Sequence, residues 1–274
     1  LLKYRLFSQV FLSWESGLSN WDYSYQNEGQ PAISFSVGQA FFRPTLNLPL
    51  SPAPFLNLSI STTGLFTGYF QSYAPGTVIR ENKPLLTAQG QLGLNLEGPV
   101  LYRIFFKGGE PYLKHLIVPF CSYSYETPLD EDISSRIISP LGFFRRDDLR
   151  YGFTQHLLLK AGESSREIVT FGLSQIYYLD PATSRLKFYY PQNPERHLAP
   201  VNGFLRFYLQ TRFSLDLSAD YNTYENNFFS FRLSANCGAP QDHFFFGLNW
   251  SKSYQILAAD SFFRRKLLGL QASF

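Results

Sequence analysis

The chain has 274 residues, of which 18% are aromatic and only 16% are charged, and its formal net charge is +3. Typical globular chains are about 25% charged. A membrane-spanning helix needs about 20 consecutive apolar residues, and the uninterrupted apolar runs of this chain, such as 244–246, are far shorter. A helical membrane protein is therefore excluded. Basic residues are scattered, so we expect no nucleic-acid partner. The chain lacks Met, and we expect it to be a mature segment or a fragment.

Apolar residues alternate with small or polar ones along most of the chain, which is typical of strands with two different faces. In 203–222, for example, Leu205, Phe207, Leu215 and Leu217 share one parity, and Arg206, Gln210, Arg212 and Asp216 share the other. The alternation predicts roughly 11 to 14 strands, near residues 4–14, 32–42, 45–50, 55–70, 85–97, 112–125, 148–161, 166–179, 203–211, 213–222, 228–237, 243–253 and 265–274.

Longer connections are expected at 15–31, 71–84, 126–147 and 180–202. The last two are rich in charge, and we expect them to be solvent-exposed loops or plugs of a lumen. Four prolines, Pro44, Pro49, Pro52 and Pro54, lie close together. Because proline donates no ladder hydrogen bond, we expect a break, a bend or a weakly paired edge at 44–54.

The same alternation occurs in soluble β-sandwiches, so other features have to decide the fold. The polar faces carry few charges, the apolar faces are rich in Phe and Tyr, and aromatic residues lie near segment ends, as a membrane interface requires. An open sheet in lipid would leave edge N–H and C=O groups unpaired. We therefore predict an all-β fold, an antiparallel transmembrane β-barrel, with residues 1–274 as a single domain.

The sequence contains no P-loop, no dinucleotide-binding fingerprint and no zinc signature, and we expect neither an enzyme nor a cofactor. His156 has the polar parity of its strand and is interpreted as a lumen-lining residue rather than the base of a lipid hydrolase. The acidic run Asp130, Glu131 and Asp132 is interpreted as solvated loop charge rather than a cation site. For Cys121 and Cys237 we favour two unpaired thiols over a disulfide.

Several segments resemble the C-terminal barrel domain of the LPS-assembly family LptD, also called OstA. Residues 98–105 resemble the family's run that leads into a "His-x-x-Glu-Pro … Tyr-x-Tyr" strand, and 112–125 resemble that strand, with Val118 at the usual Glu. Further matches are 148–154, 43–46 and the "Ser-Gln-x-Tyr-Tyr" stretch at 174–178. The residues that carry these motifs are Gly98, Pro99, Tyr102, Arg103, His115, Pro119, Gln175, Tyr177 and Tyr178. The motifs span 40–180, and from 200 onward only generic barrel strands are expected.

The resemblance implies a very large barrel in the Gram-negative outer membrane that inserts lipopolysaccharide into the outer leaflet. Its implied partners are an LptE-like lipoprotein that plugs the lumen, a periplasmic lipopolysaccharide-transport bridge and outer-membrane lipids. Lipid would leave through a seam between the family's first and last strands, with 265–274 as one lip. The chain is expected to be the later part of such a barrel, without the family's periplasmic jelly-roll domain.

If the apolar parity faces lipid, then Arg206, Gln210, Arg212 and His156 would point into the lumen, where the arginines could meet lipid A phosphates. Three alternatives remain open at this point. A passive porin or uptake channel has the same strand pattern, an outer-membrane lipid hydrolase would use His156, and a secreted soluble β-protein is the third.

Overall fold

The computed structural model describes residues 2–5, 9–25, 33–75, 77, 79–81, 83–137, 146–181, 195–210, 213–238, 245–256 and 262–273. Within these ranges the chain is almost entirely antiparallel β-sheet, which confirms the predicted all-β class. The helix found there, α1 (Glu131–Ser135), has 5 residues. None of the described helical structure has the length and apolar character that a membrane crossing would need.

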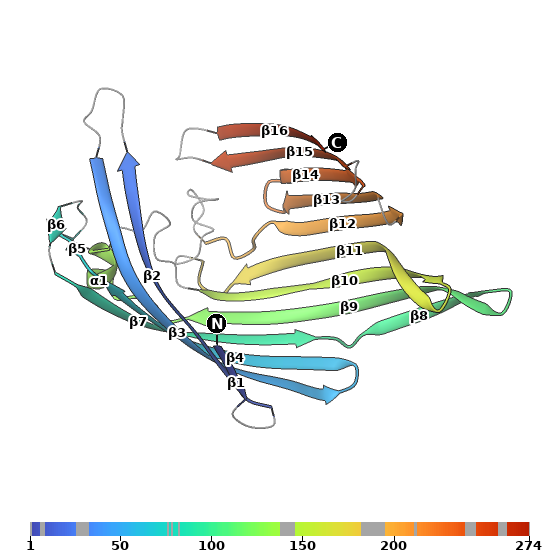
Figure 1. Ribbon diagram of the computed structural model, residues 1–274, viewed down its shortest axis with the longest axis horizontal. Coiled ribbons are helices and arrows are strands. Elements are labelled where there is room, and N and C mark those ends of the chain that lie inside the picture. The colour runs from blue at the N-terminus through green and yellow to red at the C-terminus, as the bar shows by residue number, and fades with distance from the viewer. Residues whose placement is uncertain are drawn as a thin grey trace. The chain divides into compact units, whose positions relative to one another are not determined.

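Fourteen described strands form one sheet, and its strand order follows the chain (Figure 1). The order is β1-β2-β3-β4-β7-β9-β10-β11-β12-β13-β14-β15-β16, and β8 pairs with β9 beside this path. The strands are β1 (Leu2–Arg5), β2 (Phe11–Tyr25), β3 (Ile33–Ala53), β4 (Leu56–Tyr69), β7 (Leu85–Glu97), β8 (Leu101–Lys107), β9 (Glu110–Glu126), β10 (Asp147–Ala161), β11 (Ser164–Tyr178), β12 (Val201–Gln210), β13 (Phe213–Asn222), β14 (Asn227–Cys237), β15 (Phe245–Ile256) and β16 (Phe262–Ser273). A second sheet holds β5 (Ser72–Tyr73) and β6 (Arg80–Glu81).

The chain divides into two compact units. Unit 1 comprises Leu1–Ser51, Leu58–Asn95 and Tyr123–Asp147, and unit 2 comprises Pro52–Asn57, Leu96–Ser122 and Asp148–Phe274.

In unit 1, β2 and β3 form a long ladder that runs from Phe11 opposite Asn47 to Tyr25 opposite Ile33. The expectation of a loop from residue 15 was wrong, because β2 continues to Tyr25. Serine, glycine and asparagine on both parities of 15–20 hide the strand pattern in the sequence.

Of the break, bend or weakly paired edge expected at the proline cluster, the break is not found, because β3 continues through Pro44, Pro49 and Pro52 to Ala53. Pro44 lies opposite Trp14 in the ladder. A residue of an antiparallel strand directs its N–H to one neighbour only, so this proline removes a single donor. The β2–β3 ladder ends at Asn47, and Pro49 and Pro52 therefore remove nothing from it. Pro54 lies in the turn before β4.

Unit 1 also contains a small apolar core at one end of its strands. Val37, Tyr69 and Ile137 are buried together, with Leu85, Leu129 and Ile133 packed against them. The segment after β9 supplies part of this core. Its Asp130 carboxylate caps α1 by accepting from the Asp132 N–H at 2.9 Å, and Arg136 contacts Glu81 of β6 at 2.7 Å. The acidic run thus begins a helix that is tied to β5 and β6.

In unit 2, the strands β10 to β16 lie side by side as a simple antiparallel meander (Figure 1). Strand β8 was not among the expected strands. It forms a hairpin with β9 around Gly108 and Gly109, whose φ angles of 61° and 83° lie in the region that glycine adopts without strain. Among the described residues, register shifts interrupt four ladders of unit 2: β8 with β9, β10 with β11, β12 with β13, and β13 with β14. The shift between β10 and β11 redirects a side chain of the candidate site.

Candidate functional site

One row of residues crosses the whole meander of unit 2 and is polar or glycine at every strand. The paired residues are His156, Thr170, Arg206, Asp216, Ser234, Asn249 and Gly269, one from each of β10 to β16. We call these seven residues the polar row. The next row along the strands is Leu157, Val169, Phe207, Leu215, Ala235, Leu248 and Leu270, which is apolar throughout. We call it the apolar row.

Because neighbouring residues of a strand point to opposite faces, the two rows give the sheet one polar and one apolar face. The two faces depend on the pairing register between neighbouring strands, because a slip of one residue would move each side chain of a strand to the opposite face. The registers are uninterrupted at these positions, and the two-faced surface follows from them.

The β10 end of the polar row is a hydrogen-bonded cluster around Glu167. One oxygen of this carboxylate, Oε1, lies 2.6 Å from Nδ1 of His156. The same oxygen accepts a short hydrogen bond from the Thr170 hydroxyl. His156 and Glu167 are both about one-third exposed, so the cluster is reachable from solvent.

Glu167 could not be placed on this face from the sequence. It has the parity of Val169, which belongs to the apolar row. Leu157 pairs with Val169 but Leu158 pairs with Glu167, so Ile168 has no partner of its own. This β-bulge reverses the parity of the strand beyond it, as bulges do when they redirect a side chain. A bulge leaves no signal in a pattern of alternation.

In the middle of the polar row, Arg206 and Asp216 form an ion pair between β12 and β13. Nε of Arg206 lies 2.9 Å from Oδ1 of Asp216, and the two side chains are 54% and 39% exposed. The guanidinium also lies over the Phe204 ring, 5.6 Å from its centroid. The contact to Asp216 is made through Nε, and more than half of the arginine side chain is exposed.

A second polar cluster lies beside the row. Asp220 of β13 accepts from Nδ2 of Asn202 at 2.8 Å and from the Ser230 hydroxyl. Ser234 and Asn249 hydrogen bond at 2.7 Å. The face therefore offers hydroxyl, amide and carboxylate groups, together with the guanidinium of Arg206.

Of the four residues expected to contact cargo, the structure brings His156 and Arg206 onto the same row. They are separated by one strand, because Thr170 lies opposite both. Gln210 ends β12, where only its backbone is described, and Arg212 lies outside the described residues. Thr170 lies between the two expected residues, and Asp216 follows Arg206 on the next strand.

The family-motif residues fall into two groups within unit 2. At the start of β8, Gly98 N–H donates to Pro119 C=O at 2.8 Å, and Pro99 follows in the connection to β8. Tyr102 and Arg103 are exposed on β8, and Arg103 lies opposite His115 of β9.

The second motif group lies at the end of β11. Gln175 donates through Nε2 to the Ala199 C=O at 3.0 Å, and its Oε1 accepts from the Tyr151 hydroxyl at 3.0 Å. Tyr177 stacks on His197 with ring centroids 5.1 Å apart, and the Tyr178 N–H donates to the His197 C=O at 2.8 Å. These residues hold the segment after β11 against its end.

The described cysteines, Cys121 and Cys237, are free thiols, with Cys237 exposed. Among the described residues, no three His, Cys, Asp or Glu side chains are arranged to hold a metal ion.

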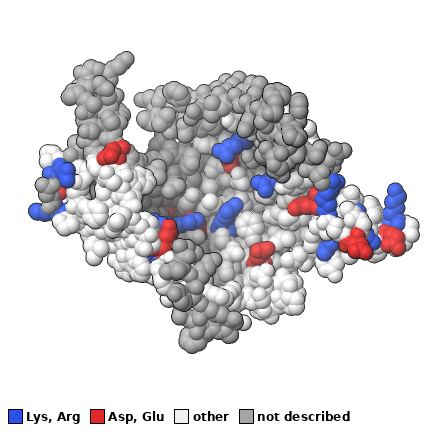
Figure 2. Space-filling view, viewed as in Figure 1, with Lys and Arg blue, Asp and Glu red and all other residues white. Residues whose placement is uncertain are grey.

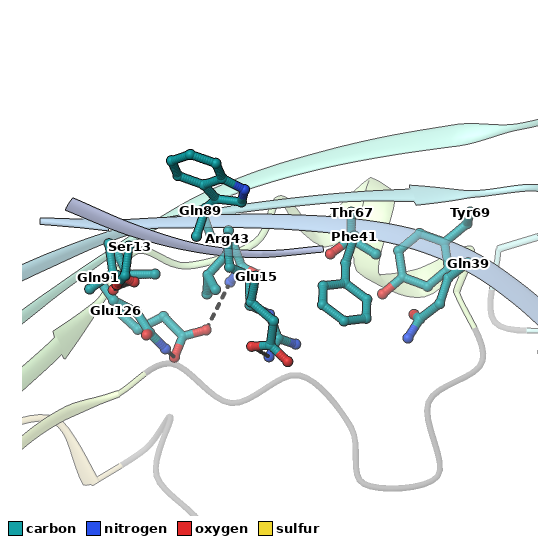
Figure 3. A pocket seen from close by; sticks show the side chains of 14 residues that line it. Ser13, Glu15, Gln39, Phe41, Arg43, Thr67, Tyr69, Gln89, Gln91 and Glu126 are labelled. Carbon is teal, nitrogen blue, oxygen red and sulfur yellow. Dashed lines mark hydrogen bonds and ion pairs between the residues drawn. The ribbon is translucent and has the colours of Figure 1, made fainter. Parts of the chain in front are cut away.

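Unit 1 carries a hollow of about 560 Å³ on its own polar face (Figure 3). Side chains from β2, β3, β4, β7 and β9 point into it, and most of them are amides or hydroxyls. The lining residues are Ser13, Trp14, Glu15, Gln39, Phe41, Arg43, Thr45, Thr63, Leu65, Thr67, Tyr69, Gln89, Gln91 and Glu126. The face opposite the hollow carries exposed Phe42 and Phe66, whose rings stack with centroids 6.4 Å apart.

Charge is sparse on these surfaces. In the face shown in Figure 2, the described Lys, Arg, Asp and Glu residues form separate small groups among described residues that are mostly uncharged. Among the described side chains, only four apolar residues are buried: Val37, Tyr69, Tyr73 and Ile137. Large apolar side chains such as Phe66, Tyr151 and Phe246 are exposed instead. A soluble sheet protein buries one face of its sheet, which this chain does not do in the described residues.

A large antiparallel sheet with one polar and one mainly apolar face is typical of outer-membrane β-strand proteins. Residues 145–261 match the family model LptD, described as LPS transport system D. Over these residues the chain is similar to the LptD family, and the predicted resemblance is confirmed for this segment. A search of curated proteins finds no match for this chain.

The matched segment corrects one expectation from the sequence. We expected specific likeness only in 40–180, and the family match instead extends over β12 to β15. The motifs at 148–154 and 174–178 lie within it, whereas those at 43–46, 98–105 and 112–125 lie before it and stay a prediction.

Proposed function

We propose that this chain is the barrel part of an outer-membrane translocon that inserts lipopolysaccharide into the outer leaflet. Residues 1–274 would form a single barrel domain, with the polar row on the water-filled side and the apolar row against lipid. The family match over residues 145–261 supports lipopolysaccharide transport in general. The route that lipopolysaccharide takes along the polar row of this chain is our proposal.

The observation that carries the proposal is the pair of neighbouring rows in unit 2. Seven consecutive registered strands keep a polar residue or glycine beside an apolar residue. A bilayer needs an apolar outer surface, and a charged, sugar-bearing headgroup needs a hydrated inner one. The exposed aromatic residues support the same orientation, because Tyr and Trp favour the membrane–water interface.

The polar row suggests how the headgroup would be received. Arg206 has a carboxylate partner at Nε, and its side chain is 54% exposed. Guanidinium groups bind phosphate through paired, charge-assisted hydrogen bonds. We infer that a lipid A phosphate competes with Asp216 for Arg206, and that His156 with Glu167 borders the same path. Gln210 and Arg212 are proposed as further contacts.

Partners follow from the same proposal. An LptE-like lipoprotein would fill part of the lumen, and a periplasmic lipopolysaccharide-transport bridge would deliver the cargo. The acyl chains would leave through a lateral seam into the lipid. Since a transport family matches the chain, we infer that it is no enzyme, and His156 has a structural partner in Glu167 rather than a serine nucleophile.

The test is complementation in cells depleted of the native protein, with lipopolysaccharide at the cell surface measured by accessibility to a surface-acting modifying enzyme. Arg206→Gln is expected to lower delivery several-fold. Arg232→Gln is the matched control, because Arg232 is another exposed arginine of the same polar parity, on β14 beside Ser218. It is expected to have a smaller effect.

Two outcomes would contradict the proposal. Normal surface lipopolysaccharide in depleted cells would remove the transport function. Ion conductance in planar bilayers with sugar-size selectivity, unchanged by loss of the lipoprotein, would indicate a passive porin instead.

A further inference from the structure

We propose that the hollow in unit 1 is a carbohydrate subsite that binds the uncharged sugar portion of the cargo. This inference rests on the proposed function, because it assigns the sugar to lipopolysaccharide. The hollow is described entirely within unit 1, and its chemistry differs from that of the polar row.

The size of the hollow suits a small polar ligand. Its volume of about 560 Å³ lies within the range of about 300–1,000 Å³ that small-molecule sites occupy. Its walls come from five strands, so their backbones are held by the sheet rather than by loops.

The amides in the hollow are already oriented. Nε2 of Gln91 donates to one oxygen of Glu126 at 2.8 Å. Nε2 of Gln89 donates to the Thr127 C=O at 3.1 Å and to the other Glu126 oxygen at 3.4 Å. Both amide nitrogens are therefore engaged, and each amide oxygen is left as an acceptor. Fixed acceptors lower the ordering cost of binding a donor.

Hydroxyl groups extend the same array. The Thr45 and Thr63 hydroxyls hydrogen bond to each other at 2.9 Å across β3 and β4. Each hydroxyl can both donate and accept. A ligand that matches acceptor amides and two-way hydroxyls has many hydroxyls of its own, which describes a sugar.

An aromatic ring provides the apolar contact. Phe41 points into the hollow beside Gln39 and Tyr69 (Figure 3). Its ring lies over Gly17 of β2, where an added Cβ would come within 2.8 Å of Cζ. The absence of a side chain at residue 17 thus sets the position of the ring, which can pack against the C–H face of a sugar.

The charges of the hollow disfavour the alternative ligand, a phosphate. Glu15 and Glu126 oppose a single cation, Arg43, which lies 3.8 Å from Glu15 and over the Phe41 ring. An anion would therefore meet more negative than positive charge. Acyl chains are disfavoured too, since most lining side chains are polar and would lose hydration without partners.

The test uses the full-length protein in lipid nanodiscs and calorimetric titration. The first probe is the oligosaccharide obtained from lipopolysaccharide after removal of lipid A and phosphate. Maltohexaose and inorganic phosphate are the second and third probes. The wild type is expected to bind the first probe more tightly than maltohexaose, without competition from phosphate.

Phe41→Ala is expected to weaken oligosaccharide binding at least tenfold. Gly17→Ala removes no polar group but displaces the ring, and it is expected to weaken binding at least threefold. Phe42→Ala changes the opposite face, and Gly68→Ala adds a Cβ whose nearest neighbour is 4.0 Å away. Both controls are expected to bind within twofold of the wild type. Thermal unfolding by circular dichroism identifies any variant that fails to fold.

Several results would overturn the inference. They are absence of oligosaccharide binding, equal binding of maltohexaose, equal competition by phosphate, or unchanged binding in folded Phe41→Ala and Gly17→Ala. Loss of the co-purifying lipoprotein in these variants, with sugar binding intact, would assign the hollow to a protein partner instead. Loss of lipopolysaccharide delivery in Arg206→Gln, measured in parallel, would leave the proposed function standing whatever the titrations show.

Discussion

Unit 1 and unit 2 obey the same alternation of apolar and polar residues, yet their polar faces have different chemistry. The hollow of unit 1 is lined mainly by amides and hydroxyls, whereas the polar row of unit 2 includes Arg206, Asp216 and His156. Alternation therefore decides which face is polar, and the register between strands decides which polar groups meet. The predictions below test the faces first, then the backbone, and last the individual contacts.

The largest expected effect comes from a charge on the apolar row. Leu215→Arg would place a guanidinium in lipid, which costs about 2–4 kcal/mol at mid-bilayer. Ser214→Arg, one residue away on the polar face, should cost less than about 1 kcal/mol. The free energy of unfolding in lipid vesicles, from urea titration, measures both. Equal losses would mean that the two faces do not differ in environment.

The matching contrast in unit 1 uses β4. Phe66→Arg is expected to lower the free energy of unfolding by about 2–4 kcal/mol, because Phe66 is 43% exposed on the face away from the hollow. Thr67→Arg enters the hollow and should be milder. If unit 1 tolerates Phe66→Arg and unit 2 does not tolerate Leu215→Arg, then only unit 2 contacts lipid.

A backbone change sharpens the comparison because it alters neither face. Gly98 has a φ of 107°, and an added Cβ would lie 2.2 Å from the Phe55 carbonyl oxygen. Gly98→Ala is expected to lower the free energy of unfolding by about 1–3 kcal/mol. Gly108→Ala is the control, since Gly108 has a φ of 61° and no atom within 4 Å of an added Cβ. Equal effects would refute the role of the Phe55 contact.

Smaller effects are expected at the two carboxylates that organise each polar face. Glu126→Ala would free the amides of Gln89 and Gln91, and Glu167→Ala would leave Thr170 and His156 without their acceptor. Each change is expected to cost about 1 kcal/mol, since the groups left behind are partly reachable by water. Urea unfolding of both variants checks this, and a loss above about 3 kcal/mol in either would indicate a buried cluster.

The smallest expected effect is the coupling between Arg206 and Asp216. Both side chains are more than one-third exposed, and exposed ion pairs contribute about 0–1 kcal/mol. A double-mutant cycle on unfolding should give a coupling within this range that decreases as salt is raised. A larger coupling, insensitive to salt, would place the pair in a dry environment and contradict a water-filled path.

The positions of most strands could be predicted from the sequence, because polar or small residues alternate with apolar residues along them. The predicted bounds of β7 and β13 agree with the structure. β2 was missed beyond residue 14 because its two parities have similar polarity. β8 was missed because its 7 residues show no polar parity: Tyr102, Ile104 and Phe106 lie on one face, and Leu101 and Phe105 lie with two basic residues on the other.

The candidate site was predictable only in part. Arg206 and His156 followed from parity, whereas their alignment through Thr170 depends on three strands keeping register. Glu167 required the bulge at Ile168, and the hollow required residues from five strands of unit 1. Which residues of different strands lie side by side is set by the pairing register between the strands. The alternation pattern of a single strand contains no information about that register.

The central claim is that the apolar row faces hydrocarbon and the polar row faces water. Nitroxide labels on single cysteines along β13, at 214–218 in a Cys121→Ser and Cys237→Ser background, test it by electron paramagnetic resonance in bilayers. The account predicts high oxygen accessibility at Leu215 and Leu217, and high accessibility to a water-soluble nickel complex at Ser214, Asp216 and Ser218. Labels at 215 and 217 that neither reagent reaches would show the apolar face packed against protein and contradict the account.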